Sequence, residues 1–200
     1  MLSNVSHPPP HEPLIRRVLG SNFLELKLVR LHVEEGDHSS TCKLNVLEGE
    51  QPVEVEGKGV GVVDAIYNAM LDRYAREYQS LKTITLSSFH VGADLETKKA
   101  QAGVDAVGRV TLEITNSEAR HFTFSDKSRS VTISIARAVL AIVQYFANAE
   151  RAFVMLHNAR RDALARNRED LVSRYTAEMA QVVESTSYAE VIASIKKELG

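Results

Sequence analysis

The residues best suited to chemistry form the glycine-rich segment Glu56-Gly57-Lys58-Gly59-Val60-Gly61-Val62-Val63-Asp64-Ala65, which holds three of the chain's ten glycines. Glycines let a loop bring its backbone N–H groups close to a small ligand. A tight turn without any ligand accounts for the glycines equally well. Asp64 also has two interpretations, because an acidic residue in the first turn of a helix either contacts a ligand or only favours the helix dipole.

The elements around this segment predict how it is held in place. Residues 23–34, residues 41–47 and a short stretch around Val53 and Val55 show the pattern of strands. After the glycines, apolar residues follow a 3.6-residue period, which predicts an amphipathic helix over residues 63–74. The predicted order is therefore three strands, a glycine-rich loop and a helix.

The same order of elements occurs a second time. Residues 81–124 contain three further strand-like segments, and a second helix begins near Ser128 or Ser130. Corresponding apolar positions, such as Val63 and Val131, lie 68 or 69 residues apart. The sequence therefore predicts an α+β fold made of two pseudo-symmetric βββα units.

The first strand of each predicted unit has one irregularity. The alternation of apolar and polar residues slips phase at Leu28-Val29 in the first unit, and between Leu86 and Phe89 in the second. A β-bulge or a strong bend produces such a slip. Alternation elsewhere predicts sheets with one face in the core and the other face wet or covered by a partner.

Composition excludes several classes of protein. A chain of 200 residues with 44% hydrophobic and 25% charged residues is ordinary for a soluble globular protein. The net charge of −2 gives no broad attraction to nucleic acid or to anionic membranes, so neither is expected as a partner. No apolar run approaches the roughly 20 residues that span a bilayer, and a cytoplasmic location is expected. The single cysteine, Cys42, is expected to be a small buried residue and cannot form an internal disulfide.

Three regions are predicted along the chain. Residues 1–20 are expected to be a disordered leader, or a tail draped over a neighbour, because four of the five prolines fall within the first 13 residues. Residues 21–148 hold the duplicated units, and residues 149–200 form a helical extension. Helices are predicted at residues 128–166, 167–184 and 188–199.

The remaining titratable residues give no indication of catalysis. The densest basic cluster is interpreted as a salt-bridged, solvated helical face rather than a phosphate or nucleic-acid site, since acidic residues lie within it. Its members are Arg160, Arg161, Arg166 and Arg168, with Asp162, Glu169 and Asp170 among them. No nucleophile–base set is found, and no metal site is expected. Four of the seven histidines, His32, His38, His90 and His121, fall in or near predicted strands and are interpreted as surface residues or satisfied strand residues rather than ligands.

Two strings of residues resemble a known family. The first is Gly-x-Gly-x-Val-Asp-Ala at residues 59–65, followed by Asn68-Ala69, and the second is Gly-Val-Asp-Ala-Val-Gly-Arg-Val-Thr-Leu at residues 103–112. Both are similar to the C-terminal regulatory (allosteric, dimerisation) domain of the isopropylmalate, citramalate and homocitrate synthase family. The resemblance covers roughly residues 23–146 and implies that domain's duplicated βββα fold. Val62 replaces the family's usual proline, and Ser128-Arg129-Ser130 replaces its usual entry into the second helix.

The resemblance implies a regulatory function. In the family this domain dimerises and binds a branched-chain amino acid or a related end product between its units. The loop and the helix N-terminus would hold a carboxylate, the apolar side chain would lie against valines and an isoleucine, and Asp64 or Asp105 would pair with an ammonium group. Ser128 and Ser130 are favoured as helix N-caps but belong to the same candidate site. The candidate effector-binding residues are Gly59, Gly61, Val62, Val63, Asp64, Ala65, Ile66, Asp105, Ala106, Ser128 and Ser130.

The resemblance also implies what is missing. Family enzymes carry a TIM-barrel catalytic domain with a His-x-His metal site, whereas a barrel needs about 250 residues and no His-x-His pair occurs in these 200 residues. We therefore expect a non-enzymatic homodimer without a cofactor that modulates a separately encoded isopropylmalate- or citramalate-type synthase. The alternative is a ligand-free assembly or scaffold module that docks a partner protein through its C-terminal helices. An enzyme with unfamiliar chemistry is disfavoured.

Overall fold

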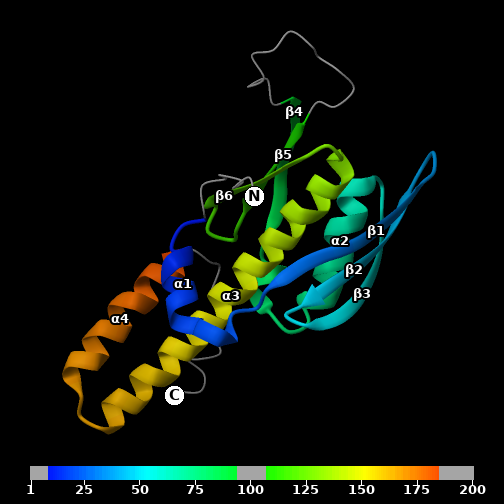
Figure 1. The fold of residues 1–200 in the computed structure, drawn as a ribbon. Coiled ribbons are helices and arrows are strands. Elements are labelled where there is room, and N and C mark those ends of the chain that lie inside the picture. The colour runs from blue at the N-terminus through cyan, green and yellow to red at the C-terminus, as the bar shows by residue number, and fades with distance from the viewer. Residues whose placement is uncertain (1–8, 94–106, 185–200) are drawn as a thin grey trace.

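The computed structural model describes residues 9–93 and 107–184, which form two successive βββα units with helices at both ends (Figure 1). The first unit is β1 (Leu26–Glu35), β2 (Ser40–Glu48), β3 (Gln51–Gly59) and α2 (Val62–Tyr74). The second unit is β4 (Thr85–Ala93), β5 (Gly108–Thr115), β6 (His121–Ser128) and α3 (Val131–Ala165). The other elements are α1 (Glu12–Leu19), α4 (Glu169–Glu184) and two short 3-10 turns, η1 (Gly20–Asn22) and η2 (Gln79–Lys82). The predicted α+β fold with a helical extension is confirmed.

Each unit contributes one antiparallel sheet, with strand orders β1-β2-β3 and β4-β5-β6. Helix α2 packs on β3 and β2, whereas α3 packs on β5 and β6 and also contacts β1. The two helices contact each other, so α3 runs between the two sheets (Figure 1). The core lies along this line and contains the fully buried side chains of Leu44, Ile66, Leu112 and Phe146. Cys42 is buried there as predicted, and burial raises the pKa of its thiol.

Both predicted strand irregularities are confirmed. The register of β1 against β2 shifts between Leu28 and Arg30, and that of β4 against β5 shifts between Leu86 and Ser88. An extra residue at a bulge returns the following side chains to the same face of the sheet. This is why the apolar residues on either side of the slip all belong to the inner face.

The glycine-rich segment differs from the predicted loop. Gly57 and Gly59 belong to strand β3, and only Val60 and Gly61 connect it to α2. A Cβ atom on Gly57 would lie 2.5 Å from the carbonyl oxygen of Ala65, and one on Gly59 would lie 2.4 Å from the backbone nitrogen of Ala65. These two glycines therefore allow the backbone of α2 to approach β3 closely.

The N-terminal segment is also more ordered than the sequence predicted. Residues 1–8 lie outside the described residues, but Glu12–Leu19, which were assigned to a disordered or draped leader, form helix α1. The reason is an i, i+4 apolar pair, since Ile15 and Leu19 are both buried where α1 packs on α3. Pro13 is compatible with this helix because it falls in the first turn, where no intrahelical N–H bond is lost.

The C-terminal extension is a helical hairpin. Helix α3 continues to Ala165, and α4 returns along it with Val182 buried (Figure 1). Arg166 pairs with Asp162 at 3.1 Å and Arg168 with Asp170 at 2.9 Å, in agreement with the salt-bridged face interpreted from the sequence. The helix predicted at residues 188–199 lies outside the described residues.

Helix α3 is the one helix of the described segments that is long and apolar enough to cross a membrane by length and composition. The expectation that no segment approaches that length was therefore wrong. Two thirds of its most apolar window is buried inside the protein, as in the core helix of a soluble fold, which satisfies the same criterion. The alanines of α3 explain both properties, because they raise its hydropathy and let neighbouring elements pack closely.

Candidate functional site

The described part of the predicted effector site lies where α2 and α3 begin, at the same end of the molecule (Figure 1). Gly59 ends β3, and Gly61 is the N-cap of α2. Ala65 and Ile66 are fully buried in the core, so their side chains serve packing. Val62 and Val63 are half-buried and Asp64 is exposed, while Asp105 and Ala106 lie outside the described residues.

The start of α3 is stabilised by its own serines. Ser130 is the N-cap, and its hydroxyl oxygen accepts a hydrogen bond from the backbone N–H of Ile133 at 3.4 Å. Ser128 donates from its hydroxyl to the carbonyl oxygen of Ser130 at 2.6 Å. Ser134 donates to Asp126 Oδ2 at 2.8 Å. Ser130 therefore has the N-cap function favoured from the sequence, whereas Ser128 ends β6 and hydrogen-bonds to the backbone of Ser130 instead of capping the helix itself.

The start of α2 is different because Gly61 offers no side chain to cap it. The first N–H groups of α2 therefore keep hydrogen-bonding capacity for solvent or an anion. A Cβ on Gly61 would meet nothing within 4 Å, and its extended backbone is open to any residue type. The start of α2 therefore has open space and backbone N–H donors, but none of the contacts described here adds a side chain that would select a particular ligand.

A cavity that the sequence did not indicate lies between α1, β6 and α3. Its volume is about 230 Å³, and it combines apolar walls with several polar side chains. It is lined by Pro9, Glu12, Ile15, Phe23, Thr123, Phe124, Ser125, Ala141, Gln144, Tyr145 and Asn148. We call this space the α1 cavity. A second, more open hollow of about 290 Å³ shares Ala141 and Gln144 with it and extends toward Leu28 and Arg137.

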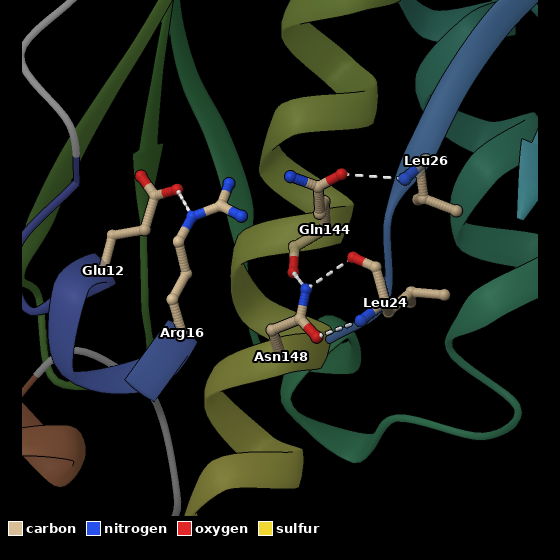
Figure 2. A network of polar contacts seen from close by, with 6 residues as sticks. All are labelled: Glu12, Arg16, Leu24, Leu26, Gln144 and Asn148. Carbon is tan, nitrogen blue, oxygen red and sulfur yellow. Dashed lines mark hydrogen bonds and ion pairs between the residues drawn. The ribbon is translucent and has the colours of Figure 1, made fainter. Parts of the chain in front are cut away.

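Two amides of α3 line the α1 cavity, and Figure 2 shows the hydrogen bonds that both of them make. Asn148 is fully buried, and its Oδ1 accepts from the Leu24 N–H at 2.7 Å while its Nδ2 donates to the Leu24 carbonyl at 2.8 Å. One turn earlier, Gln144 Oε1 accepts from the Leu26 N–H at 2.8 Å. These bonds hold the chain leading into β1 against α3 and fix the orientation of both amides.

The opposite wall carries charge. Glu12 Oε1 accepts a hydrogen bond from Arg16 Nε at 2.7 Å, one helical turn away in α1. The Arg16 guanidinium lies 4.1 Å from the centre of the Phe23 ring, a cation–π contact that holds it in position. Figure 2 shows both side chains on the side of α1 that faces α3. The polar lining of the α1 cavity therefore includes the carboxylate of Glu12, which is paired with Arg16, and the side-chain amides of Gln144 and Asn148.

Sequence reasoning missed the α1 cavity for an identifiable reason. Glu12 and Ile15 were assigned to a leader, so they were not considered as part of a site. A usable signal was present in α3, where Gln144 and Asn148 interrupt an otherwise apolar stretch at i, i+4 spacing. Polar residues inside a buried helix face have partners, and here the partners are backbone groups far away in the sequence.

The fold is a duplicated βββα domain in which the start of α2 has no side-chain cap, the start of α3 is capped by Ser130, and a cavity lies between α1, β6 and α3. A scan against protein families matches residues 11–147 to the LeuA allosteric (dimerisation) domain. The chain therefore belongs to the LeuA allosteric (dimerisation) domain family. A search among curated proteins finds no match for this chain. The family match includes α1 and ends inside α3, so it contains every residue that lines the α1 cavity except Pro9 and Asn148.

Proposed function

We propose that this chain is a cytoplasmic regulatory module that acts as a homodimer, binds a small branched-chain amino acid or a related metabolite, and modulates a separate acyl-transferring synthase. It needs no cofactor and performs no catalysis in this proposal. Membership in an allosteric and dimerisation family supports the regulatory part. The observation that carries the homodimer is an apolar face on β4 that is exposed in the part of the chain that the structure describes.

Comparison of the two units reveals this uncovered face. Leu31 pairs with Leu44 across the first sheet, and Phe89 pairs with Leu112 across the second, so Leu31 and Phe89 occupy equivalent inner-face positions. In the first sheet α3 contacts β1, and Leu31 packs against the core. In the second sheet α3 contacts β5 and β6 instead, and Phe89 stays 40% exposed.

Val91 repeats the pattern of Phe89. It pairs with the fully buried Val110 but remains 50% exposed, whereas its equivalent Val33 packs against the core. Exposed apolar residues on the inner face of a sheet indicate a surface that another element covers. Because this is a dimerisation domain, we assign that cover to a second copy of the chain, related by two-fold symmetry.

The homodimer is tested by the mass of the protein in solution. We expect light scattering with size-exclusion chromatography to give the mass of a dimer for the wild type and of a monomer for the double variant Phe89→Ser, Val91→Ser. Val29→Ser is the matched control, since Val29 is an exposed valine of β1 away from this face. A double variant that remains dimeric would place the interface elsewhere.

The ligand part of the proposal is tested separately by thermal unfolding with leucine, isoleucine, valine, their 2-oxo acids and acetyl-CoA. A ligand at about 100 times its dissociation constant adds roughly 2.7 kcal/mol to the free energy of unfolding. If none of these compounds shifts the unfolding temperature, the ligand-binding part of the proposal fails and only the homodimer part remains.

One observation favours the alternative of a ligand-free scaffold. The part of α3 beyond residue 147 lies outside the family match and carries three exposed apolar side chains, Val154, Met155 and Leu164. Such residues on a projecting helical hairpin suit a partner protein. This alternative makes two predictions: the wild type shows no response to any of the ligands, and the double variant Met155→Ser, Leu164→Ser loses binding to the synthase. Both results together would support the scaffold.

A further inference from the structure

We propose that residues 188–199 dock as a third helix on the hairpin of α3 and α4, where they cover an apolar face that the two helices share. The proposal concerns the hairpin alone and rests neither on a ligand nor on the β4 dimer. The tip of the hairpin and β4 lie at opposite ends of the molecule (Figure 1). One contact between α3 and α4 defines the face.

That contact joins Arg160 of α3 to Thr176 of α4. Arg160 Nε donates to Thr176 Oγ1 at 2.8 Å, and the Thr176 hydroxyl donates to the Val172 carbonyl at 2.8 Å. Because the two helices run antiparallel, the pair also fixes which other residues lie at the same height. Leu164, four residues after Arg160, is level with Val172, four residues before Thr176. We call the surface around these residues the Arg160 face.

Both helices present a stripe of the same length on the Arg160 face. Residues at i, i+4, i+7 and i+11 lie on one side of a helix. They are Phe153, His157, Arg160 and Leu164 on α3, and Val172, Thr176, Met179 and Val183 on α4. At the base of the hairpin, Phe153 is 4% exposed and Val183 packs against the core, whereas at the tip Leu164 is 49% exposed and Val172 is half-buried. Among the described residues, cover of this face therefore ends before the tip.

The sequence after α4 carries a third stripe with the same spacing. Helix α4 ends at Glu184, and residues 185–200 lie outside the described residues. The apolar positions of the helix predicted there are Tyr188, Ile192, Ile195 and Leu199, again at i, i+4, i+7 and i+11. An amphipathic helix this short is stable only when its apolar stripe is buried against another surface.

The connections between the helices also match. Residues 166–168 join α3 to α4, and a connection of equal length, residues 185–187, joins α4 to the predicted helix. Short connections place successive helices side by side and antiparallel. A helix that runs back along α4 in this way brings Tyr188 level with Val183 and Leu199 level with Val172. Each stripe spans about 16 Å at 1.5 Å per residue, so the stripes coincide from end to end.

The polar pair at the centre of the Arg160 face accepts an apolar neighbour. In this register Ile195 lies over Thr176, whose hydroxyl already accepts from Arg160 and donates to the Val172 carbonyl. Covering a hydroxyl that has both a donor and an acceptor leaves no polar group unpaired. At the tip, Leu199 would remove Leu164 and Val172 from water, which the hydrophobic effect favours.

The test is a disulfide between the two ends of the proposed contact. The double variant Leu164→Cys, Leu199→Cys brings two thiols together when the segment docks, since a disulfide needs Cα atoms within about 7 Å. The native Cys42 is buried and does not compete. We expect the bond to form within one chain under mild oxidation, at least tenfold faster than in Val154→Cys, Leu199→Cys. Val154 is the matched control, because it is 42% exposed but lies ten residues earlier on α3.

A second measurement tests the contact through stability. Leu164→Ser should lower the unfolding temperature of the wild-type chain by about 2 °C or more beyond its effect in a chain that also carries Ile192→Ser and Ile195→Ser. In that second chain the docked contact is already lost, so Leu164 has nothing left to contribute to it. The matched background is Ala189→Ser, Ala193→Ser, which lies off the stripe and should leave the effect of Leu164→Ser unchanged.

Each outcome decides the proposal. A disulfide within one chain, together with the coupled loss of stability, supports docking. A disulfide between two chains, seen as a covalent dimer on denaturing, non-reducing electrophoresis, would overturn it and assign the Arg160 face to a second copy. Cross-linking no faster than in the Val154 control would also overturn it. So would equal effects of Leu164→Ser in all three backgrounds, and the hairpin tip would then be open to a partner protein.

Discussion

The side-chain amide of Asn148 pairs with both backbone groups of Leu24, accepting its N–H at 2.7 Å and donating to its carbonyl at 2.8 Å (Figure 2). The two residues are 124 positions apart, and Leu24 lies just before β1. Asn148 thus supplies the hydrogen bonds that a neighbouring strand would give. This contact anchors the first unit to the helix of the second.

We expect Asn148→Ala to lower the free energy of unfolding by about 2–4 kcal/mol, because it leaves two buried backbone groups without partners. Urea unfolding monitored by circular dichroism measures the change. Asn68→Ala is the control, since its amide is exposed and makes one bond to the Lys58 carbonyl at 3.0 Å. A loss no larger than that of the control would show that the Leu24 groups find other partners.

The glycines of β3 lead to a second prediction. Gly57→Ala should lower the free energy of unfolding by about 1–3 kcal/mol or more, because the new methyl group would overlap Ala65 and Ala69 of α2. Gly61→Ala should change it by less than about 1 kcal/mol, since nothing lies within 4 Å. Thermal unfolding of these two variants tests whether Gly57 is needed for close packing of β3 on α2 or only forms part of a ligand-binding loop. If both variants lost the same amount of unfolding free energy, the different functions assigned to Gly57 and Gly61 would be contradicted.

The order of elements was predictable because polarity reports directly on which face of a sheet or helix is buried. The phase slip at Leu28-Val29 even gave the bulge, since a bulge changes that alternation locally. The function of Gly57 was not predictable. It depends on a tertiary contact between β3 and α2, and the presence of a glycine in a sequence does not show whether it forms a turn or allows two elements to pack closely. The α1 cavity was hidden for a similar reason, since it joins Glu12 to Gln144 from distant parts of the chain.

The carboxylate of Glu150 leads to a third prediction. It is 8% exposed and accepts from the N–H groups of Gln79 at 3.2 Å and Ser80 at 2.9 Å, in the η2 turn between the two units. Glu150→Ala should lower the free energy of unfolding by about 2–3 kcal/mol, because charge-assisted bonds to buried donors are lost. Glu150→Gln keeps an acceptor and should cost less. Chemical denaturation of both variants measures the difference, and equal costs would show that the charge itself is what matters.

Alkaline pH should destabilise the fold through the tyrosines in α2 and in the segment that follows it. Burial raises the pKa of Tyr67 to about 12 from an ordinary value of 10.0. Its hydroxyl donates to the carbonyl of Ile84 at 3.4 Å, a contact that needs the protonated phenol. Above pH 10 the unfolded chain loses this proton while the folded chain keeps it. The stability from Tyr67 is therefore complete below about pH 10 and is lost as pH rises through about 12.

The two-unit pKa difference corresponds to about 2–3 kcal/mol of unfolding free energy lost over this range. Urea midpoints between pH 8 and 12 measure it. Tyr67→Phe should flatten the profile without abolishing it, because burial also raises the pKa of Tyr74 and Tyr78. If the variant and the wild type lose stability in parallel, Tyr67 does not contribute and the alkaline sensitivity belongs to the other two tyrosines.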